Sequence, residues 1–160
     1  MALKERERQH VHAFREAVES YAVREGIGCE PERVDHPGEA VLSSRFSAGP
    51  HQWYVLTVQP FLPQFSAGAL TDDPFCDKDF ERLSLQAGLT KPEFVQLGFE
   101  AAGLVWRDPP VQHFRDRDNV YYFVTPVDLP SFEMLTEAAT IDKAKRMLLG
   151  YHLAFSGRVA

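Results

Sequence analysis

The 160-residue chain has only two cysteines, Cys29 and Cys76, so it can form at most one intramolecular disulfide. A domain of this length can bury enough apolar surface to fold without disulfides or a structural metal. No apolar run approaches the roughly 18 residues that crossing a bilayer requires. The N-terminal stretch MALKERERQHVHAF alternates in charge and lacks the apolar region of a secretory signal peptide. We therefore expect a cytoplasmic protein with reduced thiols and no membrane partner.

Positive charge is also scarce. The chain has 17 Lys and Arg residues against 23 Asp and Glu residues, which gives a formal net charge of −6. An acidic surface repels phosphate backbones, so we do not expect nucleic acid as a partner. The 44% of hydrophobic and 25% of charged residues are typical of a folded globular protein and exclude a wholly disordered chain.

Motifs for catalysis, metal binding and cofactor binding are missing from the sequence. It contains no GxSxG, no Walker loop and no GxGxxG. Neither cysteine has a CxxC partner, and His10 and His12, two residues apart, would point in different directions on a helix. We therefore predict no catalytic residue, no metal ligand and no cofactor, and a protein that is not an enzyme.

The hydrophobic pattern predicts a single α+β domain over residues 1–160. Apolar residues at steps of three and four indicate helices, and β-branched or aromatic residues at alternate positions indicate strands. We expect, in order, a helix over 3–25, strands at 33–35, 41–47 and 52–59, helices over 79–89 and 90–102, strands at 104–108, 111–115 and 119–127, and a helix ending at Gly157. This order, in outline α-βββ-α-ββ-α, predicts an antiparallel sheet packed against helices.

Residues 60–77, PFLPQFSAGALTDDPFCD, are expected to be irregular. The stretch has three prolines, and its large apolar residues fit neither the helical nor the strand period. Long irregular segments are uncommon in compact domains and often have a function. The sequence leaves open whether the segment packs on the core or docks a partner, although large exposed apolar patches are rare.

Residues 79–103 have the outline of a helix-turn-helix. Thr90 and Glu93 form a capping-box pattern that predicts the start of the second helix. A winged-helix DNA-binding regulator using 79–126 is therefore an alternative function. Its basic face would come from Arg82, Lys91, Arg115 and Arg117. Neighbouring carboxylates neutralise these residues, so we rank this function second.

A third possibility is a small-ligand-binding protein or an enzyme of unknown chemistry. It would need a pocket into which His113, His36 or Asp35 converge.

The order of the elements resembles the α-βββ-α-ββ-α layout of the type III secretion chaperone-like proteins. The resemblance is carried by the hairpin VLSSRFSAGPHQWYVLTVQ, the helix KPEFVQLGFEAAG and the C-terminal stretches NVYYFVTPVDLP and MLLGYHLAFSG. The long 60–77 segment and the interruption VWRDPPVQHF depart from that layout. The resemblance implies a homodimer that binds an extended segment of another protein on apolar surface.

Peptide capture needs apolar grooves and strand edges, and it needs no catalytic groups. We therefore expect a non-catalytic interaction module, chaperone-like or adaptor-like, that binds a partner through apolar sheet and loop surface. The candidate partner-binding residues are Trp53, Phe61, Leu62, Phe65 and Tyr121.

Overall fold

The computed structural model describes residues 4–36, 41–59, 62–104, 110–116 and 120–158. Its elements are α1 (Glu5–Arg24), β1 (Cys29–His36), β2 (Val41–Gly49), β3 (Gln52–Gln59), β4 (Gln64–Thr71), α2 (Pro74–Gln86), α3 (Lys91–Ala101), β5 (Gln112–Arg115), β6 (Tyr121–Asp128), the 3-10 helix η2 (Phe132–Thr136) and α4 (Ala138–Phe155). The strands form one antiparallel sheet in the order β1-β2-β3-β4-β6-β5.

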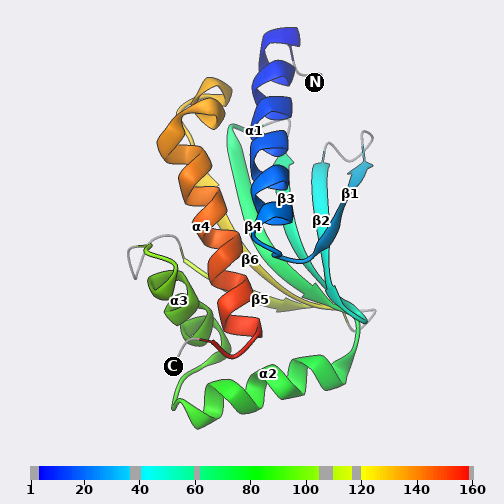
Figure 1. Ribbon diagram of the computed structural model, residues 1–160, viewed down its shortest axis with the longest axis vertical. Helices are drawn as coiled ribbons and strands as arrows, with labels where there is room; N and C mark the ends of the chain where they lie inside the picture. The colour runs from blue at the N-terminus through cyan, green and yellow to red at the C-terminus, as the bar shows by residue number, and fades with distance from the viewer. Residues whose placement is uncertain (1–3, 37–40, 60–61, 105–109, 117–119, 159–160) are drawn as a thin grey trace.

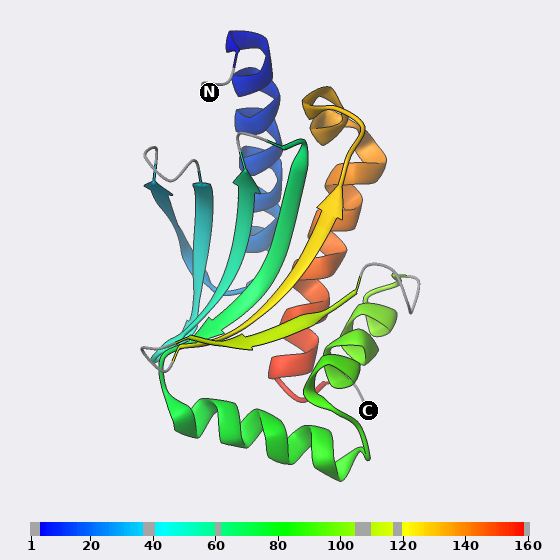
Figure 2. The same ribbon diagram turned by 180° about the vertical axis from the view of Figure 1, so that it is seen from behind.

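The helices pack against one face of this sheet. Helices α1 and α4 lie next to each other across that face, α3 packs beside the lower half of α4, and α2 runs below the lower end of the strands (Figure 1). Seen from behind, the opposite face carries none of the described helices (Figure 2). The predicted fold class, an α+β domain with an antiparallel sheet packed against helices, is confirmed.

Two predicted helix boundaries have clear local causes. Helix α1 ends where Gly26 adopts the left-handed conformation, with a φ of 66°, which costs glycine little because it has no Cβ. Helix α3 begins at the predicted capping box. The Thr90 hydroxyl accepts from the Glu93 amide at 3.3 Å, and the Thr90 amide donates to the Glu93 carboxylate at 3.0 Å.

Strand β4 differs from the irregular segment expected over 60–77. Its sequence, QFSAGALT, is rich in small residues with weak strand preference. It is nevertheless a strand because β3 pairs with it on one side and β6 on the other. Alternation along β4 turns Phe65, Ala67 and Ala69 toward the helices, where all three are buried.

The two edge strands are β1 and β5. Strand β1 spans eight residues, more than the predicted 33–35, and includes Pro31, which an edge strand tolerates because one row of its amides needs no partner. Strand β5 has only four residues. Most of the strand predicted at 104–108 lies outside the described residues.

The core fills the space between the sheet and the helices. The ring of Phe14 on α1 lies 5.1 Å from the ring of Phe65 on β4. The rings of Phe99 on α3 and Tyr151 on α4 are 5.2 Å apart. Apolar burial of this kind is the main favourable contribution to folding. No helix in the described ranges combines the length and apolar character needed to span a bilayer.

Candidate functional site

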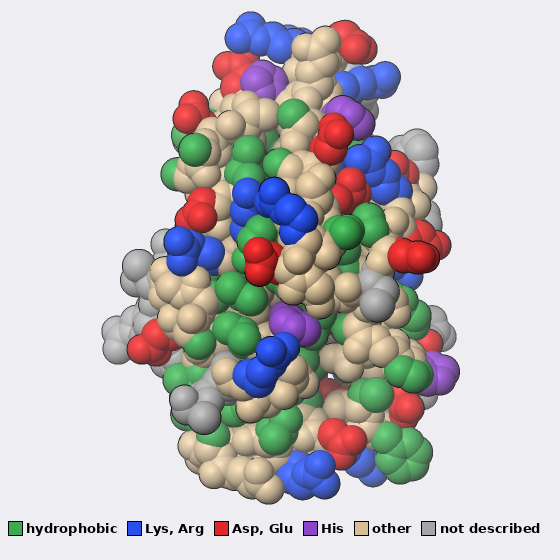
Figure 3. Space-filling view, viewed as in Figure 1, with side chains coloured by type: hydrophobic (Ala, Val, Ile, Leu, Met, Phe, Trp, Pro, Cys, Tyr) green, Lys and Arg blue, Asp and Glu red, His purple; other side chains and the backbone are tan. Residues whose placement is uncertain are grey.

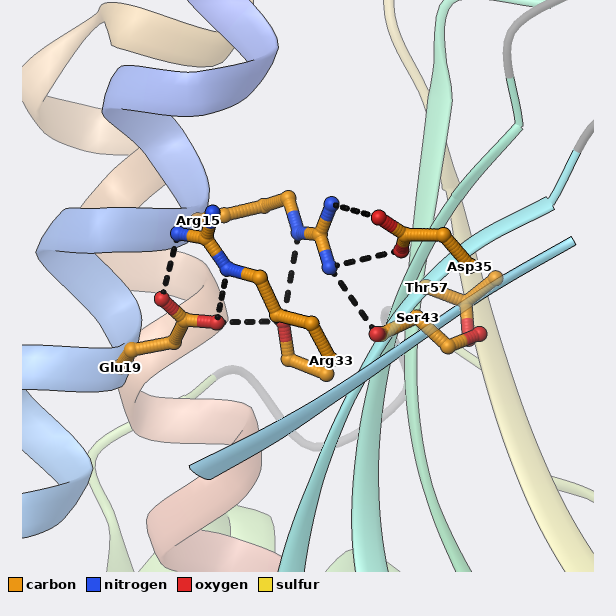
Figure 4. A network of polar contacts seen from close by, with 7 residues as sticks. Arg15, Glu19, Arg33, Asp35, Ser43 and Thr57 are labelled. Carbon is orange, nitrogen blue, oxygen red and sulfur yellow. Dashed lines mark hydrogen bonds and ion pairs between the residues drawn. The ribbon is translucent and has the colours of Figure 1, made fainter. Parts of the chain in front are cut away.

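A polar network joins α1 to the edge of the sheet (Figure 4). Arg33 on β1 makes a two-pronged ion pair with Glu19 on α1, with nitrogen–oxygen distances of 2.8 and 3.1 Å. Arg15, one turn earlier on α1, pairs with Asp35 on β1 at 2.9 Å. The hydroxyl of Ser44 on β2 donates to Glu19 at 2.7 Å and accepts from Arg15 at 3.3 Å.

Every nitrogen of the Arg15 guanidinium in this network has an acceptor. Burial alone would raise the pKa of Glu19. The hydrogen bonds from Arg33 and Ser44, with the charges of Arg33 and Arg15, outweigh burial and lower that pKa. Glu19 is therefore a carboxylate at neutral pH. Because the network satisfies its own groups, its role is to attach β1 and β2 to α1.

A second polar cluster joins α2, α3 and β5. The ammonium group of Lys91 lies 2.7 Å from Oδ2 of Asp77, and both side chains are largely buried. Nε2 of His113 lies 3.7 Å from Oδ1 of Asp77, which is too long for a hydrogen bond. Oδ1 of Asp77 and Nε2 of His113 are both buried, and neither atom has a hydrogen-bond partner among the described residues.

Burial, with the nearby charge of Lys91, lowers the pKa of His113 against the opposing effect of Asp77 and Glu81. The imidazole is therefore neutral at pH 7, and it stacks on Phe123 with the ring centres 4.5 Å apart. These contacts give His113 a packing role between β5 and the helices. Neither His113 nor Asp35 lines either of the two hollows on the opposite face of the sheet.

The uncovered face of the sheet presents a different surface, and strand register arranges it in rows. Read across β2, β3, β4, β6 and β5, the rows are Ser47–Trp53–Leu70–Tyr122–Phe114 and Arg45–Val55–Gly68–Val124–Gln112, with Ser43–Thr57–Ser66–Pro126 across the first four strands. The row with Trp53, Leu70 and Tyr122 is largely aromatic and aliphatic. The row with Ser43, Thr57 and Ser66 carries hydroxyl groups, and the row with Arg45 lies between the two. We call this surface, made of these three rows, the open face.

Two adjoining hollows mark the open face. The first, of about 210 Å³, lies over Arg45, Val55 and Gly68 and reaches the hydroxyl row. The second, shallower hollow of about 500 Å³ lies between Trp53 and Tyr122. Arg45, Leu70 and Tyr122 line both hollows, so they form one continuous depression. Gly68 keeps its floor low, and a Cβ there would overlap the carbonyl oxygen of Phe123.

Arg45 differs from Arg15 in having an unused donor. Its Nε atom is buried and has no hydrogen-bond partner. Glu32 lies opposite Arg45 in the β1–β2 register, but the two form no ion pair within 4 Å. A buried guanidinium nitrogen without an acceptor is costly, because arginine stays charged at any physiological pH.

The five predicted partner-binding residues are not brought together. Trp53 lies on the open face, whereas Phe65 is 1% exposed in the core. Tyr121 is on the helix side of β6, with the Arg115 guanidinium 5.4 Å from its ring centre. Leu62, 54% exposed, lies in the turn before β4. Phe61 is outside the described residues.

Arg45 was not among the predicted site residues. The alternation of VLSSRFS already places it opposite the core-facing Leu42 and Phe46. Residues of β4 and β6 form much of the hollow around Arg45, and the sequence did not predict β4.

Two of the four basic residues required by the winged-helix alternative, Arg82 and Lys91, have acidic partners, and Arg115 lies over the ring of Tyr121. Arg82 pairs with Asp79 at 3.2 Å, and Lys91 pairs with Asp77. Arg117 is outside the described residues. On the face that carries α1 and α4, basic and acidic side chains are interspersed (Figure 3).

Among the residues that the structure places, no group of three or more His, Cys, Asp and Glu side chains could hold a metal ion. Comparisons of the chain with protein-family models, with curated proteins and with solved structures gave no match.

Proposed function

We propose that the chain is a non-catalytic, chaperone-like or adaptor-like module that binds a segment of another polypeptide on the open face. The observation that carries this proposal is the apolar row Trp53–Leu70–Tyr122, which lies beside Arg45 on a sheet face without a described helix. Half-buried aromatic residues around a depression are typical of protein-binding surfaces.

The residue types on the open face also favour a protein partner. Tryptophan, tyrosine and arginine are the residues that contribute most often to binding energy at protein interfaces. Trp53, Tyr122 and Arg45 line the same depression. Backbone groups within a paired sheet are already hydrogen-bonded, so a ligand on this face is held by side-chain contacts.

Two further features belong to this proposal. The resemblance to the type III secretion chaperone-like proteins implies a homodimer, which light scattering coupled to gel filtration checks directly. The two lone cysteines and the lack of a long apolar run favour a cytoplasmic protein, which cell fractionation checks.

The test is selection from a phage-displayed library of random peptides on the full-length chain, followed by affinity measurements with synthetic peptides. Two variants receive the same substitution at different places. Leu70→Glu puts a charge among Trp53 and Tyr122, whereas Leu85→Glu changes an α2 residue that is 67% exposed. Circular dichroism and thermal unfolding confirm that both variants fold.

We expect the selected peptides to bind the wild-type chain and Leu85→Glu alike, and to bind Leu70→Glu at least about tenfold more weakly, a loss of about 1.4 kcal/mol. Failure to enrich any peptide above an uncoated surface contradicts the proposal. Equal binding to the two folded variants contradicts it as well, because the peptides then bind elsewhere.

A further inference from the structure

Arg45 defines the chemistry of the segment that the open face binds. We infer that the bound segment carries one Asp or Glu side chain, which pairs with Arg45, next to an aromatic or aliphatic residue that packs on Trp53, Leu70 and Tyr122. This inference rests on the proposed function and adds the charge and the order of the residues recognised.

The first argument is the unused hydrogen-bonding capacity of Arg45. Its buried Nε has no acceptor, and within the described part of the chain the guanidinium forms no ion pair. Arg15, on helix α1 against the other face of the sheet, has an acceptor for every guanidinium nitrogen. Among the side chains of an unmodified polypeptide, the carboxylate of Asp or Glu is the group whose two oxygens match the guanidinium fork.

The second argument is the lining of the hollow around Arg45. None of the residues that line it is Asp or Glu, so no fixed carboxylate there competes for the guanidinium. Ser43, Thr57 and Ser66 contribute hydroxyl groups, and those of Ser43 and Thr57 are 3.2 Å apart. A hydroxyl group can turn its hydrogen toward an anion. A cation beside hydroxyl donors, in a hollow whose own lining includes no Asp or Glu, favours an anionic group.

The third argument limits the segment to a single acidic residue. Asp72 and Asp116 line the neighbouring hollow between Trp53 and Tyr122. A second carboxylate placed there would meet these two acids, and the chain as a whole carries a net charge of −6. Screening in physiological salt extends over about 8 Å, so this repulsion is local. The hollow therefore accepts an apolar or aromatic side chain beside the acidic one.

The shape of the depression favours a polypeptide over a small free carboxylate. The hollow around Arg45, of about 210 Å³, is the smaller of the two. It opens into the second hollow, which Trp53 and Tyr122 flank. Two linked hollows of different chemistry fit neighbouring side chains of one peptide.

The test uses the library selection described above and reads residue preferences from the enriched peptides. We expect one Asp or Glu to be enriched within two positions of an aromatic or aliphatic residue, and runs of acids to be depleted. Replacing that acidic residue with Asn or Gln in a synthetic peptide should weaken binding about 10- to 100-fold, the range for a hydrogen bond to a charged group.

Substitutions at Arg45 test whether this residue causes the preference for an acidic side chain. Arg45→Met should bind the acidic and amide peptides equally, and Arg45→Glu should enrich Lys or Arg in place of the acid. Arg82→Met, at a position whose side chain is 68% exposed on α2, is the matched control and should keep the wild-type preference. Thermal unfolding of each variant confirms that it is folded.

The outcomes separate this inference from the proposed function. If no peptide is enriched, both fail. If peptides bind the wild-type chain and not Leu70→Glu, the proposed function holds. The inference alone then fails in either of two cases: the enriched peptides have no preference for an acidic residue, or Arg45→Met keeps that preference. It is also overturned if hexanoate alone binds as tightly as the peptides. A self-associating wild type that Leu70→Glu converts to a monomer would show that a second copy occupies the face.

Discussion

The backbones of α3 and α4 come close together at Gly98 and Gly150. A Cβ added to Gly98 would overlap the carbonyl oxygen of Gly150, and one added to Gly150 would overlap the ring of Phe99. Neither glycine has a positive φ, so space rather than backbone conformation requires it. The close approach holds α3 against α4, and α4 lies on the sheet.

We predict that Gly98→Ala and Gly150→Ala each lower the free energy of unfolding by about 1–3 kcal/mol, the usual cost of overfilling a packed site. At a helix position with free space, replacing Gly by Ala stabilises by about 0.5–1 kcal/mol. A decrease in the free energy of unfolding would therefore show that the two helices are in close contact at these glycines. Urea unfolding measures the effect, with Glu100→Ala on the exposed side of α3 as the control. A gain in stability at Gly98 or Gly150 would contradict the close approach.

The second prediction concerns two buried hydroxyl groups. Those of Thr125 on β6 and Tyr151 on α4 are 2.7 Å apart, and both residues are 0% exposed. Tyr151→Phe leaves the Thr125 hydroxyl without this partner and should cost about 1–3 kcal/mol. Adding Thr125→Val should restore part of that loss. A double-mutant cycle by urea unfolding measures the coupling, and strictly additive effects would argue against the bond.

The third prediction tests the network around Glu19. Glu19→Ala removes the acceptor of both Arg33 and Ser44 and should cost about 3 kcal/mol, the lower end for removing one partner of a buried ion pair. The lower end applies because the Arg33 side chain is 40% exposed and regains water. Glu16→Ala is the control, since that side chain is 66% exposed and its salt bridge is to His12. Its effect should stay within about 0.5 kcal/mol.

The fourth prediction is a loss of stability in acid. Burial and the charge of Arg158 lower the pKa of His152, and burial and Lys91 lower that of His113. Below the ordinary histidine pKa of 6.5, the unfolded chain takes up protons that the folded chain does not. The free energy of unfolding should therefore fall as the pH drops through 6.5. The lowered pKa of Glu19 adds a second fall below its ordinary value of 4.5.

Urea unfolding on both sides of pH 6.5 measures this dependence.

The hydrogen bonds of His152 explain why its neutral form is favoured. Arginine only donates, so Nε2 of His152 accepts from Arg158 at 2.7 Å, and Nδ1–H of His152 then donates to the Tyr54 hydroxyl at 3.2 Å. Protonation removes that acceptor. His152→Gln should reduce the fall through pH 6.5 to the part that His113 contributes, and it should leave the fall due to Glu19 unchanged. Stability that is constant or rises on acidification through pH 6.5 would contradict the prediction.

Local signals in the sequence were sufficient for several elements of the fold. The Thr90–Glu93 capping box predicted the start of α3, because its two hydrogen bonds involve residues three apart. Gly26 predicted the end of α1 in the same way. The fold class followed from such local patterns, since helical and strand periods are read from neighbouring residues.

Strand β4 and the open face could not be predicted from local pattern. Small residues such as Ser66 and Gly68 have weak strand preference, and only pairing with β3 and β6 makes β4 a strand. Without β4, the sequence could not show that Phe65 faces the helices. It also could not show that Arg45 lies in a hollow. The site arises from strand register, which depends on residues far apart in the chain.

The order β3-β4-β6 has a consequence for synthesis on the ribosome. Strand β4 ends at Thr71, but its partner β6 begins only at Tyr121, after α2, α3 and β5. During elongation, a nascent chain with the first four strands therefore has β4 as a temporary sheet edge. At about 5–20 residues per second, that edge waits several seconds for its partner. We therefore expect the uncovered edge of β4 to be open to wrong strand pairing during this interval.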